Sequence, residues 1–309
     1  MMTTTHWVSR NTSVIDGRSA TRRDRLEARR HIVAVGLATA ALFATALGWT
    51  PSSATALTIV FAAVALGVPH GALDIVIGRR LTRASVFFEL YLAVAVVTAV
   101  IWIAAPVVGL FAFLVASWFH FARGDAAHRR GLGGAAALSG MATAGCAIGL
   151  PLALHSAIVT PVLADLLMGT AAPTAAQVAA VGWMIAYPSL VAGIVAGLAA
   201  MQARQYAALV EIIVIALLAG AVHPLGSFAL YFSLWHSPRH MIALDIDRTT
   251  WARSLGTSAA LLVVGAAAWR LTGPSAATAT RVVFIGLAAL TWPHLGVTEM
   301  FRRRPSAQP

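Results

Sequence analysis

Lysine is absent from this sequence, and cysteine is nearly so. All 22 basic residues are arginines, and Cys146 is the single cysteine among 309 residues. A chain without lysine cannot hold an aldehyde as a Schiff base on a side-chain amine. One cysteine excludes an intramolecular disulfide, a cysteine-ligated zinc site and a typical iron–sulfur site. The small neighbours Gly145 and Ala147 favour a packing role for Cys146.

Charged side chains are also scarce. They make up 11% of the residues, against roughly 25% in a soluble globular protein. So few charges do not cover a soluble surface, which argues against a soluble enzyme, a nucleic-acid-binding domain and a disordered chain. The net charge of +11 does not indicate a nucleic-acid partner, because the arginines lie at the ends of apolar segments and in the N-terminal tail.

Long apolar segments dominate the chain instead. Hydrophobic residues make up 59% of it, and its mean hydropathy is +0.80. Most segments are near the length that a helix needs to cross about 30 Å of hydrocarbon. The sequence therefore predicts an all-α fold, a polytopic transmembrane helical bundle of about 8–10 spans embedded in the lipid bilayer. The apolar segments lie at 32–50, 54–77, 84–105, 107–122, 133–157, 175–201, 206–222, 225–244, 252–270 and 280–300.

The arginines give these segments an orientation. They follow the even-numbered segments and are scarce in the other loops, as the positive-inside rule requires when both termini are cytoplasmic. Arg270 and Arg281, which flank a predicted outside loop, are the exceptions. We expect a multi-pass protein of the inner (plasma) membrane. It would have a disordered cytoplasmic tail at 1–31, a single transmembrane domain at 32–301 and a short basic cytoplasmic tail at 302–309.

Histidines inside the spans are the main candidates for chemistry, because ionisable groups in a membrane are costly. His236 and His240 lie one helical turn apart on one face, a spacing that lets two imidazoles reach one metal ion. Ser237 stands where the HExxH metallopeptidases have their glutamate, so no general base is expected there. Pro238 is expected to bend the span between the two histidines. The alternative is a pair of packed, hydrogen-bonded histidines.

Two other segments combine a histidine with a carboxylate. His70 and Asp74 have the same one-turn spacing, and Asp74 is suited to hold the second ring nitrogen of a metal-bound imidazole. The alternative is a pair that only ties helices together. His120 lies among aromatic residues near the end of its span, with Asp125 close behind it in the chain. The alternative for His120 is a place in an interfacial aromatic belt.

The depth of these histidines is the stronger signal. With the predicted orientation, five of them fall in the cytoplasmic half of their spans, so separate helices present imidazoles at a similar level. Neutral imidazoles suit a divalent ion such as Fe(II), Cu or Zn, and iron with open positions can bind O₂. The five histidines are His70, His120, His236, His240 and His294.

Four runs of residues resemble the Brp/Blh family of membrane β-carotene 15,15′-dioxygenases. Their order and approximate spacing match from about residue 60 to residue 300. The resemblance implies a non-haem Fe²⁺ enzyme that uses O₂ to split the central 15,15′ double bond of β-carotene, giving two all-trans-retinal molecules. The runs are GVPHGALD (67–74), WFHFARGD (118–125), FALYFSLWHSPRH (228–240) and VFIGLAALTWPH (283–294).

The resemblance also assigns residues. It implies four metal ligands: His70, His120, His236 and His240. We expect Asp74, Asp125 and His294 to lie behind or beside these ligands, with the role of His294 left open. Aromatic residues near the ligands are candidates to line a tunnel and stack on the polyene, although ordinary packing is the alternative for each. These aromatic residues are Phe119, Phe121, Tyr231 and Trp235.

Other functions remain as alternatives. A family member that has lost cleavage would act as a carotenoid- or retinal-handling membrane protein. A histidine-lined ion or metal transporter would have polar residues across the whole membrane depth. A diiron desaturase would have more histidines with HxxHH repeats, and a bis-histidine haem protein would show a Soret band. For the oxygenase, the absence of lysine predicts free release of retinal, and a functional link to a retinal-binding rhodopsin is a further expectation.

Overall fold

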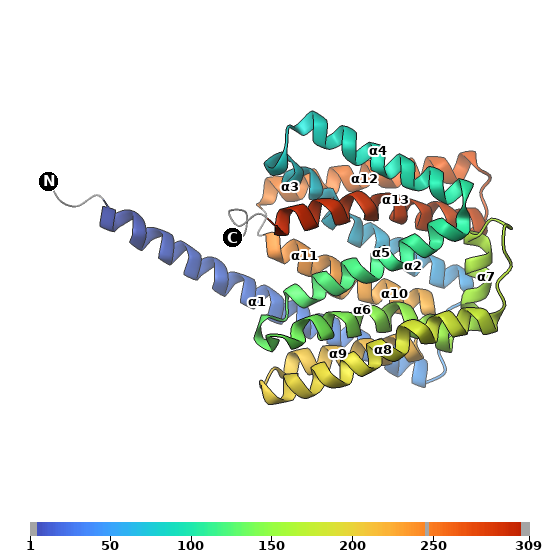
Figure 1. The fold of residues 1–309 in the computed structure, drawn as a ribbon, viewed down its shortest axis with the longest axis horizontal. Helices are drawn as coiled ribbons and strands as arrows, with labels where there is room; N and C mark the ends of the chain where they lie inside the picture. Colours follow the sequence, from blue (N-terminus) through green and yellow to red (C-terminus); the bar gives the residue numbers. More distant parts are fainter. Residues whose placement is uncertain (1–4, 245–246, 304–309) are drawn as a thin grey trace.

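A computed structural model of the chain describes residues 5–244 and 247–303. These residues form a bundle of α-helices, with no strand among them (Figure 1). The all-α prediction is confirmed. The helices are α1 (Thr5–Ala46), α2 (Ser53–Ala72), α3 (Asp74–Leu81), α4 (Ala84–Ala104), α5 (Pro106–Ala127), α6 (Ala135–Leu154), α7 (Ser156–Leu166), α8 (Ala175–Gln202), α9 (Tyr206–Ala221), α10 (Pro224–Tyr231), α11 (Ser237–Leu244), α12 (Arg248–Leu271) and α13 (Ala276–Arg302), with a short 3-10 turn η1 (Arg130–Leu132) and a π-helical turn η2 (Phe232–His236).

Seven stretches of the described residues are helical, long and apolar enough to cross a membrane. The polytopic bundle is therefore supported, with fewer full-length spans than the eight to ten predicted. Three of the ten predicted segments are not among them: the segment at 32–50, which is the end of α1, the segment at 206–222, where α9 is shorter, and the segment at 225–244, which is divided among α10, η2 and α11. The seven stretches are Thr58–Arg79, Ala84–Ala104, Pro106–Ala127, Ala135–Leu154, Ala175–Gln202, Arg248–Leu271 and Ala276–Arg302.

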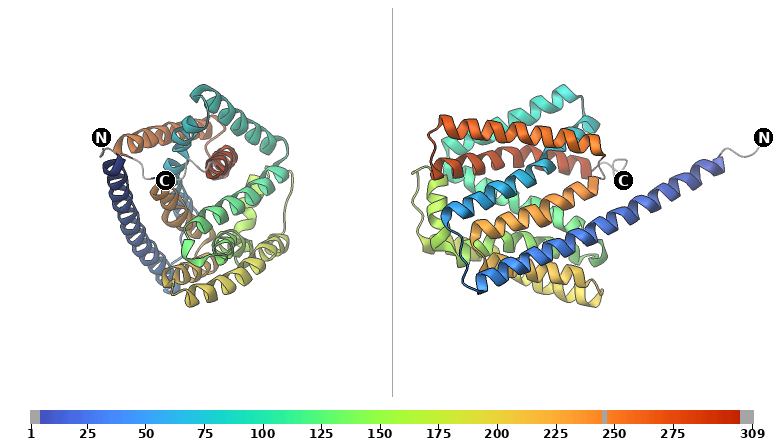
Figure 2. Two further views of the ribbon diagram at one scale, coloured as in Figure 1. Left: turned by 60° about the vertical axis from the view of Figure 1, so that its left-hand side comes forward. Right: turned by 180° about the vertical axis from the view of Figure 1, so that it is seen from behind.

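The N-terminal end of the chain differs from the expected tail. Helix α1 is continuous from Thr5 to Ala46 and extends well beyond the bundle at its N-terminal end (Figures 1 and 2). Residues 5–31, predicted to be a disordered tail, are thus helical in the structure. Arg30 explains part of this order, because its guanidinium pairs with the buried Glu211 of α9. Residues 1–4 and most of the predicted C-terminal tail, 304–309, lie outside the described residues.

One helix was not expected from the pattern of spans. Residues 156–166, predicted as the end of one span and part of an outside loop, form the separate helix α7. Its eleven residues are too few to cross a bilayer, but they are mostly apolar, and Val159 and Leu166 are buried against the bundle. A short helix that buries its apolar side is invisible to a search for long spans.

Small residues let the central helices approach closely. Helix α6 is buried along most of its length between α5 and α8. A side chain at Gly140 would meet the backbone of α5, and one at Gly182 would meet the backbone of α6 at Ala153. Such close contact between backbones is typical of helices packed in membranes. The packing gives a rigid frame for the helices that carry the histidines.

The histidine-bearing helices meet on the other side of α5. Helix α13 lies against α4, α5 and α12, and α2 packs on α10 and α12 (Figure 2). His70, His120 and His294 all lie in the C-terminal halves of α2, α5 and α13. They therefore reach the same end of the bundle as η2 and α11, as the predicted common depth requires.

Candidate active site

Five imidazoles converge in the interior of the bundle. They come from α2 (His70), α5 (His120), η2 (His236), α11 (His240) and α13 (His294), and we call them the imidazole cluster. The ring centre of His70 lies 5.1 Å from that of His236, 5.6 Å from His240 and 5.0 Å from His294. The ring of His120 lies 4.7 Å from His236 and 4.6 Å from His294. The structure thus brings together all four predicted ligands and adds His294 to them.

The nitrogen atoms of the imidazole cluster suit a metal ion. The Nε2 atoms of His120 and His236 are 3.1 Å apart, close to the roughly 3 Å between adjacent nitrogen ligands with metal bonds of about 2.1 Å. One nitrogen from each of His70, His120 and His294 lies within 4.8 Å of the others. His240 Nε2 and His294 Nε2 are buried without a hydrogen-bond partner. Buried nitrogens left unpaired are costly unless something binds them, so this donor set fits a divalent cation.

Asp74 orients His294 rather than His70. The Nδ1–H of His294 donates to the Asp74 carboxylate at 2.8 Å, and Tyr91 donates its hydroxyl hydrogen to the same carboxylate at 3.0 Å. The Nδ1–H of His70 donates to the Gly67 carbonyl instead. The predicted one-turn pairing of His70 with Asp74 is corrected here. Helix α2 ends before Asp74 and α3 begins with it, so the two residues do not share one continuous helix.

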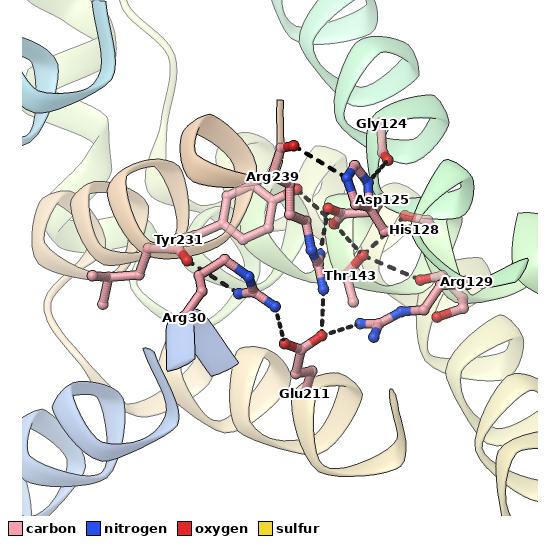
Figure 3. A network of polar contacts seen from close by, with 12 residues as sticks. Arg30, Gly124, Asp125, His128, Arg129, Thr143, Glu211, Tyr231 and Arg239 are labelled. Atoms are coloured by element: carbon pink, nitrogen blue, oxygen red, sulfur yellow. Dashed lines mark hydrogen bonds and ion pairs between the residues drawn. The ribbon is translucent and has the colours of Figure 1, made fainter. Parts of the chain in front are cut away.

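Asp125 belongs to a second polar group, next to the imidazole cluster. One carboxylate oxygen accepts a hydrogen bond from Arg239 at 2.7 Å, and the other accepts from Thr143 at 2.6 Å and Tyr231 at 3.0 Å (Figure 3). Arg239 lies between His236 and His240 in the chain. Asp125 therefore supports, through Arg239, the turn that carries two imidazoles, and its hydrogen bonds among the described residues go to Arg239, Thr143 and Tyr231 rather than to an imidazole.

Glu211 lies at the centre of this charged group (Figure 3). It is 1% exposed, and its carboxylate pairs with Arg30 at 2.6 Å, Arg129 at 2.5 Å and with Arg239. Helices α1, α5, α9 and α11, with the turn after α5, are linked in this way. We call the six charged residues of this group the charged cluster: Glu27, Arg30, Asp125, Arg129, Glu211 and Arg239.

Two titratable groups at the edge of the charged cluster have shifted pKa values. Burial lowers the pKa of His128, and the charge of Arg239 lowers it further, so this imidazole is neutral near pH 7. Burial alone would raise the pKa of Glu27. The hydrogen bond and charge of Arg30, with the charge of Arg239, outweigh burial and hold that pKa below its usual range. Both shifts favour the balanced arrangement of charges that the structure shows.

A cavity of about 230 Å³ opens beside the imidazole cluster. Its walls are largely apolar and come from α2, α4, α5, α10, α12 and α13, with imidazoles of His70, His120, His236 and His294 among them. Phe88 and Leu92 of α4 line it and are 58% and 52% exposed. The mouth of the cavity therefore faces the outer side of α4, where a membrane-bound protein meets lipid. We call this cavity the site pocket.

Of the four predicted aromatic contacts, Phe121 lines the site pocket and the other three do not. Phe119 is 47% exposed, and the guanidinium of Arg123 lies over its ring, 5.8 Å from the ring centre. Tyr231 and Trp235 are buried on the opposite side of their helix, in the core against α5 and α6. Helical spacing explains this: positions 228, 232 and 236 share the face toward the site, whereas 231 and 235 fall on the next face.

Two residues of the site were underestimated from sequence. His294 follows a proline within an apolar helix, as His70 does, and this repeated Pro-His pair is a signal that links the two. Glu211 was not singled out, although it is an acidic residue in the otherwise apolar segment 206–221, where an ionisable group marks a functional or structural site. The sequence does not show which residues these two contact, because their partners come from helices that are distant in the chain.

Comparison with known proteins agrees with this geometry. The family described as "Beta-carotene 15,15'-dioxygenase" matches residues 61–302 of the chain. The chain belongs to this family. A dioxygenase of this family carries out oxidative cleavage of β-carotene at the 15,15′ double bond, and the family's matched range contains every member of the imidazole cluster.

A curated member of the same family supports the assignment. A protein named "Beta-carotene 15,15'-dioxygenase" from Uncultured marine bacterium 66A03 is 26% identical over 281 residues, covering 79% of this chain and 93% of its own length. No solved structure matches this chain. Helix α1 lies before the range that the family matches, so its contacts with Glu211 are outside the family pattern.

Proposed function

We propose that this carotenoid-cleaving dioxygenase works with Fe²⁺ held by the imidazole cluster and with O₂ as co-substrate. The observation that supports this most is the convergence of five imidazoles beside an apolar pocket. Four of them, those of His70, His120, His236 and His294, are buried and line the pocket, and His240 is partly buried next to them. Imidazole nitrogens are ligands that suit Fe²⁺. His294 joins His70, His120, His236 and His240 in this proposal because its free nitrogen faces the same centre.

The bound iron would supply the dioxygen chemistry that breaks the double bond. The chain's own residues prepare the site for it. Asp74 holds the proton of His294 on Nδ1, and the Gly67 carbonyl does the same for His70, so that each Nε2 is left as a ligand. The apolar walls of the site pocket exclude water and bind the polyene by contact with its surface. Phe121 and Phe232, which lie against His236, are placed to contact the central part of the substrate.

Membrane embedding suits this substrate. β-Carotene dissolves in lipid, and a pocket whose mouth is lined by exposed residues of α4 spares its transfer through water. The absence of lysine leaves no side-chain amine to retain an aldehyde product. Two retinal molecules would thus pass freely to a retinal-binding protein such as a rhodopsin. The arginine pattern supports an inner (plasma) membrane location with both termini cytoplasmic.

Expression in β-carotene-producing bacteria tests the activity directly. Cells should lose their orange colour and accumulate retinal. His236→Ala should keep the colour and retain no iron after purification, while its amount in the membrane stays normal. The matched control is His155→Ala, because His155 is the end residue of α6, where its ring contacts the Gly220 carbonyl rather than the imidazole cluster. Persistent colour with the unmodified chain at normal levels would instead favour a carotenoid-handling protein or a transporter.

A further inference from the structure

A second apolar cavity adjoins the site pocket. It has a volume of about 120 Å³ and is lined by residues of α5, α6, α7, α10 and α13, among them Ile158, which is 43% exposed. Val159 and Leu163 of α7 form part of its wall, together with Ala147 of α6. We call it the α7 pocket, since α7, the helix not foreseen from the spans, closes one side of it.

The two pockets share a wall of four residues, Phe113, Ser117, Phe121 and Phe228. This wall stands directly beside the imidazole cluster. The ring of Phe121 lies 4.5 Å from that of His236. Phe228 stacks on Phe232 at 5.8 Å, and Phe232 stacks on His236 at 5.9 Å. The α7 pocket therefore begins where the site pocket meets the imidazoles, on the side of the wall away from the mouth at α4.

The symmetry of the reaction makes this arrangement informative. Cleavage at the central double bond requires that two equal halves of a long polyene extend from the reacting atoms. The site pocket offers an apolar path from the imidazoles to its lipid-facing mouth for one half. The other half needs apolar space beyond the imidazoles. A hydrocarbon cannot hydrogen-bond to polar groups that line a buried cavity, so binding in a polar cavity would be costly. The α7 pocket is lined almost entirely by apolar side chains and lies in that position.

We propose that the α7 pocket is the second half-site for the carotenoid and that its depth selects the bond that is cleaved. One half of the substrate passes the shared wall and ends against α7, which places the central double bond at the imidazole cluster. Only side chains separate the two pockets at this wall, so rotation of the phenylalanine rings connects them. Val159 and Leu163 are specificity-determining residues in this view. The inference rests on the proposed function, since it takes the imidazole cluster as the reaction centre.

Filling the α7 pocket provides the test. Val159→Phe adds volume at a position that is 8% exposed, and Val191→Phe makes the same change on the outer face of α8, where residue 191 is 61% exposed. The two substrates are β-carotene and a truncated apocarotenal that keeps one ring and the central double bond but has a shorter second half. Val159→Phe should lower the ratio of kcat/KM for β-carotene to that for the short substrate by about tenfold. Val191→Phe should leave this ratio unchanged.

Enlarging the pocket gives an independent measurement, in case the filled variant folds poorly. Leu163→Ala should let β-carotene enter further, so that aldehydes of unequal length form beside retinal. The proposal is overturned if Leu163→Ala gives retinal alone and Val159→Phe does not lower the ratio. Retinal formation by the unmodified protein in the same assay tests the proposed function separately, because it depends on the reaction centre and not on which variant fills the pocket.

Discussion

The imidazole cluster and the charged cluster are neighbours that use buried polar groups in opposite ways. In the charged cluster, both oxygens of Asp125 and of Glu211 have partners, and three arginines face three carboxylates. In the imidazole cluster, His70 and His294 each have one nitrogen held by an oxygen, but the Nε2 atoms of His120 and His236 face each other, and those of His240 and His294 have no partner. The two central carboxylates of the first cluster are thus satisfied by the protein itself, whereas the second cluster keeps buried nitrogens that fit the cation proposed above.

This difference separates stability from chemistry. Paired charges in a region of low dielectric hold helices together and strongly disfavour loss of one member. Unpaired imidazole nitrogens contribute little to the free energy of folding, but they remain available to bind a metal ion. Arg239 connects the two clusters, because it pairs with Asp125 and Glu211 and lies between His236 and His240 in the chain. The charged cluster thus supports the geometry of the imidazole cluster without contributing ligands to it.

The largest expected effect comes from breaking the imidazole cluster. His294→Ala should lower iron affinity by more than about a hundredfold. Replacing a residue that only hydrogen-bonds to a metal ligand already lowers metal affinity by about 10–100-fold, and the loss of a ligand itself should cost more. Retinal formation should fall with the iron. Iron per chain by elemental analysis of the purified protein checks this, with His155→Ala as the control. Full iron content in His294→Ala would show that His294 is not a ligand.

Breaking the charged cluster should cost stability. Glu211→Gln leaves buried arginines without their central partner, and we expect a loss of about 3–5 kcal/mol in the free energy of unfolding. Glu299→Gln is the matched control, because Glu299 pairs with the half-exposed Arg123, and such pairs contribute about 0–1 kcal/mol. Denaturation in detergent measures both. Similar losses in the two variants would contradict the contrast drawn between buried and exposed pairs.

A smaller effect is expected where a carboxylate touches the imidazole cluster. Asp74→Asn weakens the hydrogen bond that orients His294 and should reduce iron affinity by about 10–100-fold. Tyr91→Phe removes only a neutral donor to Asp74, a change of about 1 kcal/mol, so its effect should be several times weaker. Titration of the iron-free proteins with Fe²⁺ measures both affinities. A weaker effect for Asp74→Asn than for Tyr91→Phe would show that the hydrogen bond from His294 to Asp74 does not support metal binding.

The smallest effect should follow change on the outer face of α5. Phe119→Ala alters an exposed ring that lines neither pocket, so retinal formation should stay within about twofold of the unmodified protein. Phe121→Ala, two positions along the helix, removes part of the wall shared by the two pockets and should reduce the rate clearly more. Initial rates with β-carotene compare them. A larger loss of rate for Phe119→Ala than for Phe121→Ala would indicate that Phe119 contacts the substrate.

Much of the fold could be predicted from hydropathy, because most of the long apolar segments become single helices, while those at 54–77 and 225–244 are each divided among shorter ones. The break between α4 and α5 at Pro106 was also predictable, since proline is favoured at the first position of a helix and disfavours helical geometry in the residue before it. Helix α7 was not, because the stability of so short a helix depends on contacts with other helices. The four predicted ligands do meet, whereas the pairing of Asp74 with His294 joins residues 220 positions apart.

The sequence by itself determined the membrane class, the family and the histidines that meet in the imidazole cluster, because these depend on composition, spacing and residue type along the chain. Tertiary structure decided which groups meet: that Asp74 serves His294, that Glu211 closes the charged cluster, and that Tyr231 and Trp235 turn away from the pockets. It also decided that α7 encloses a second cavity. Packing sets these partnerships, since helices distant in the chain approach through side-chain shape and burial that no local pattern encodes.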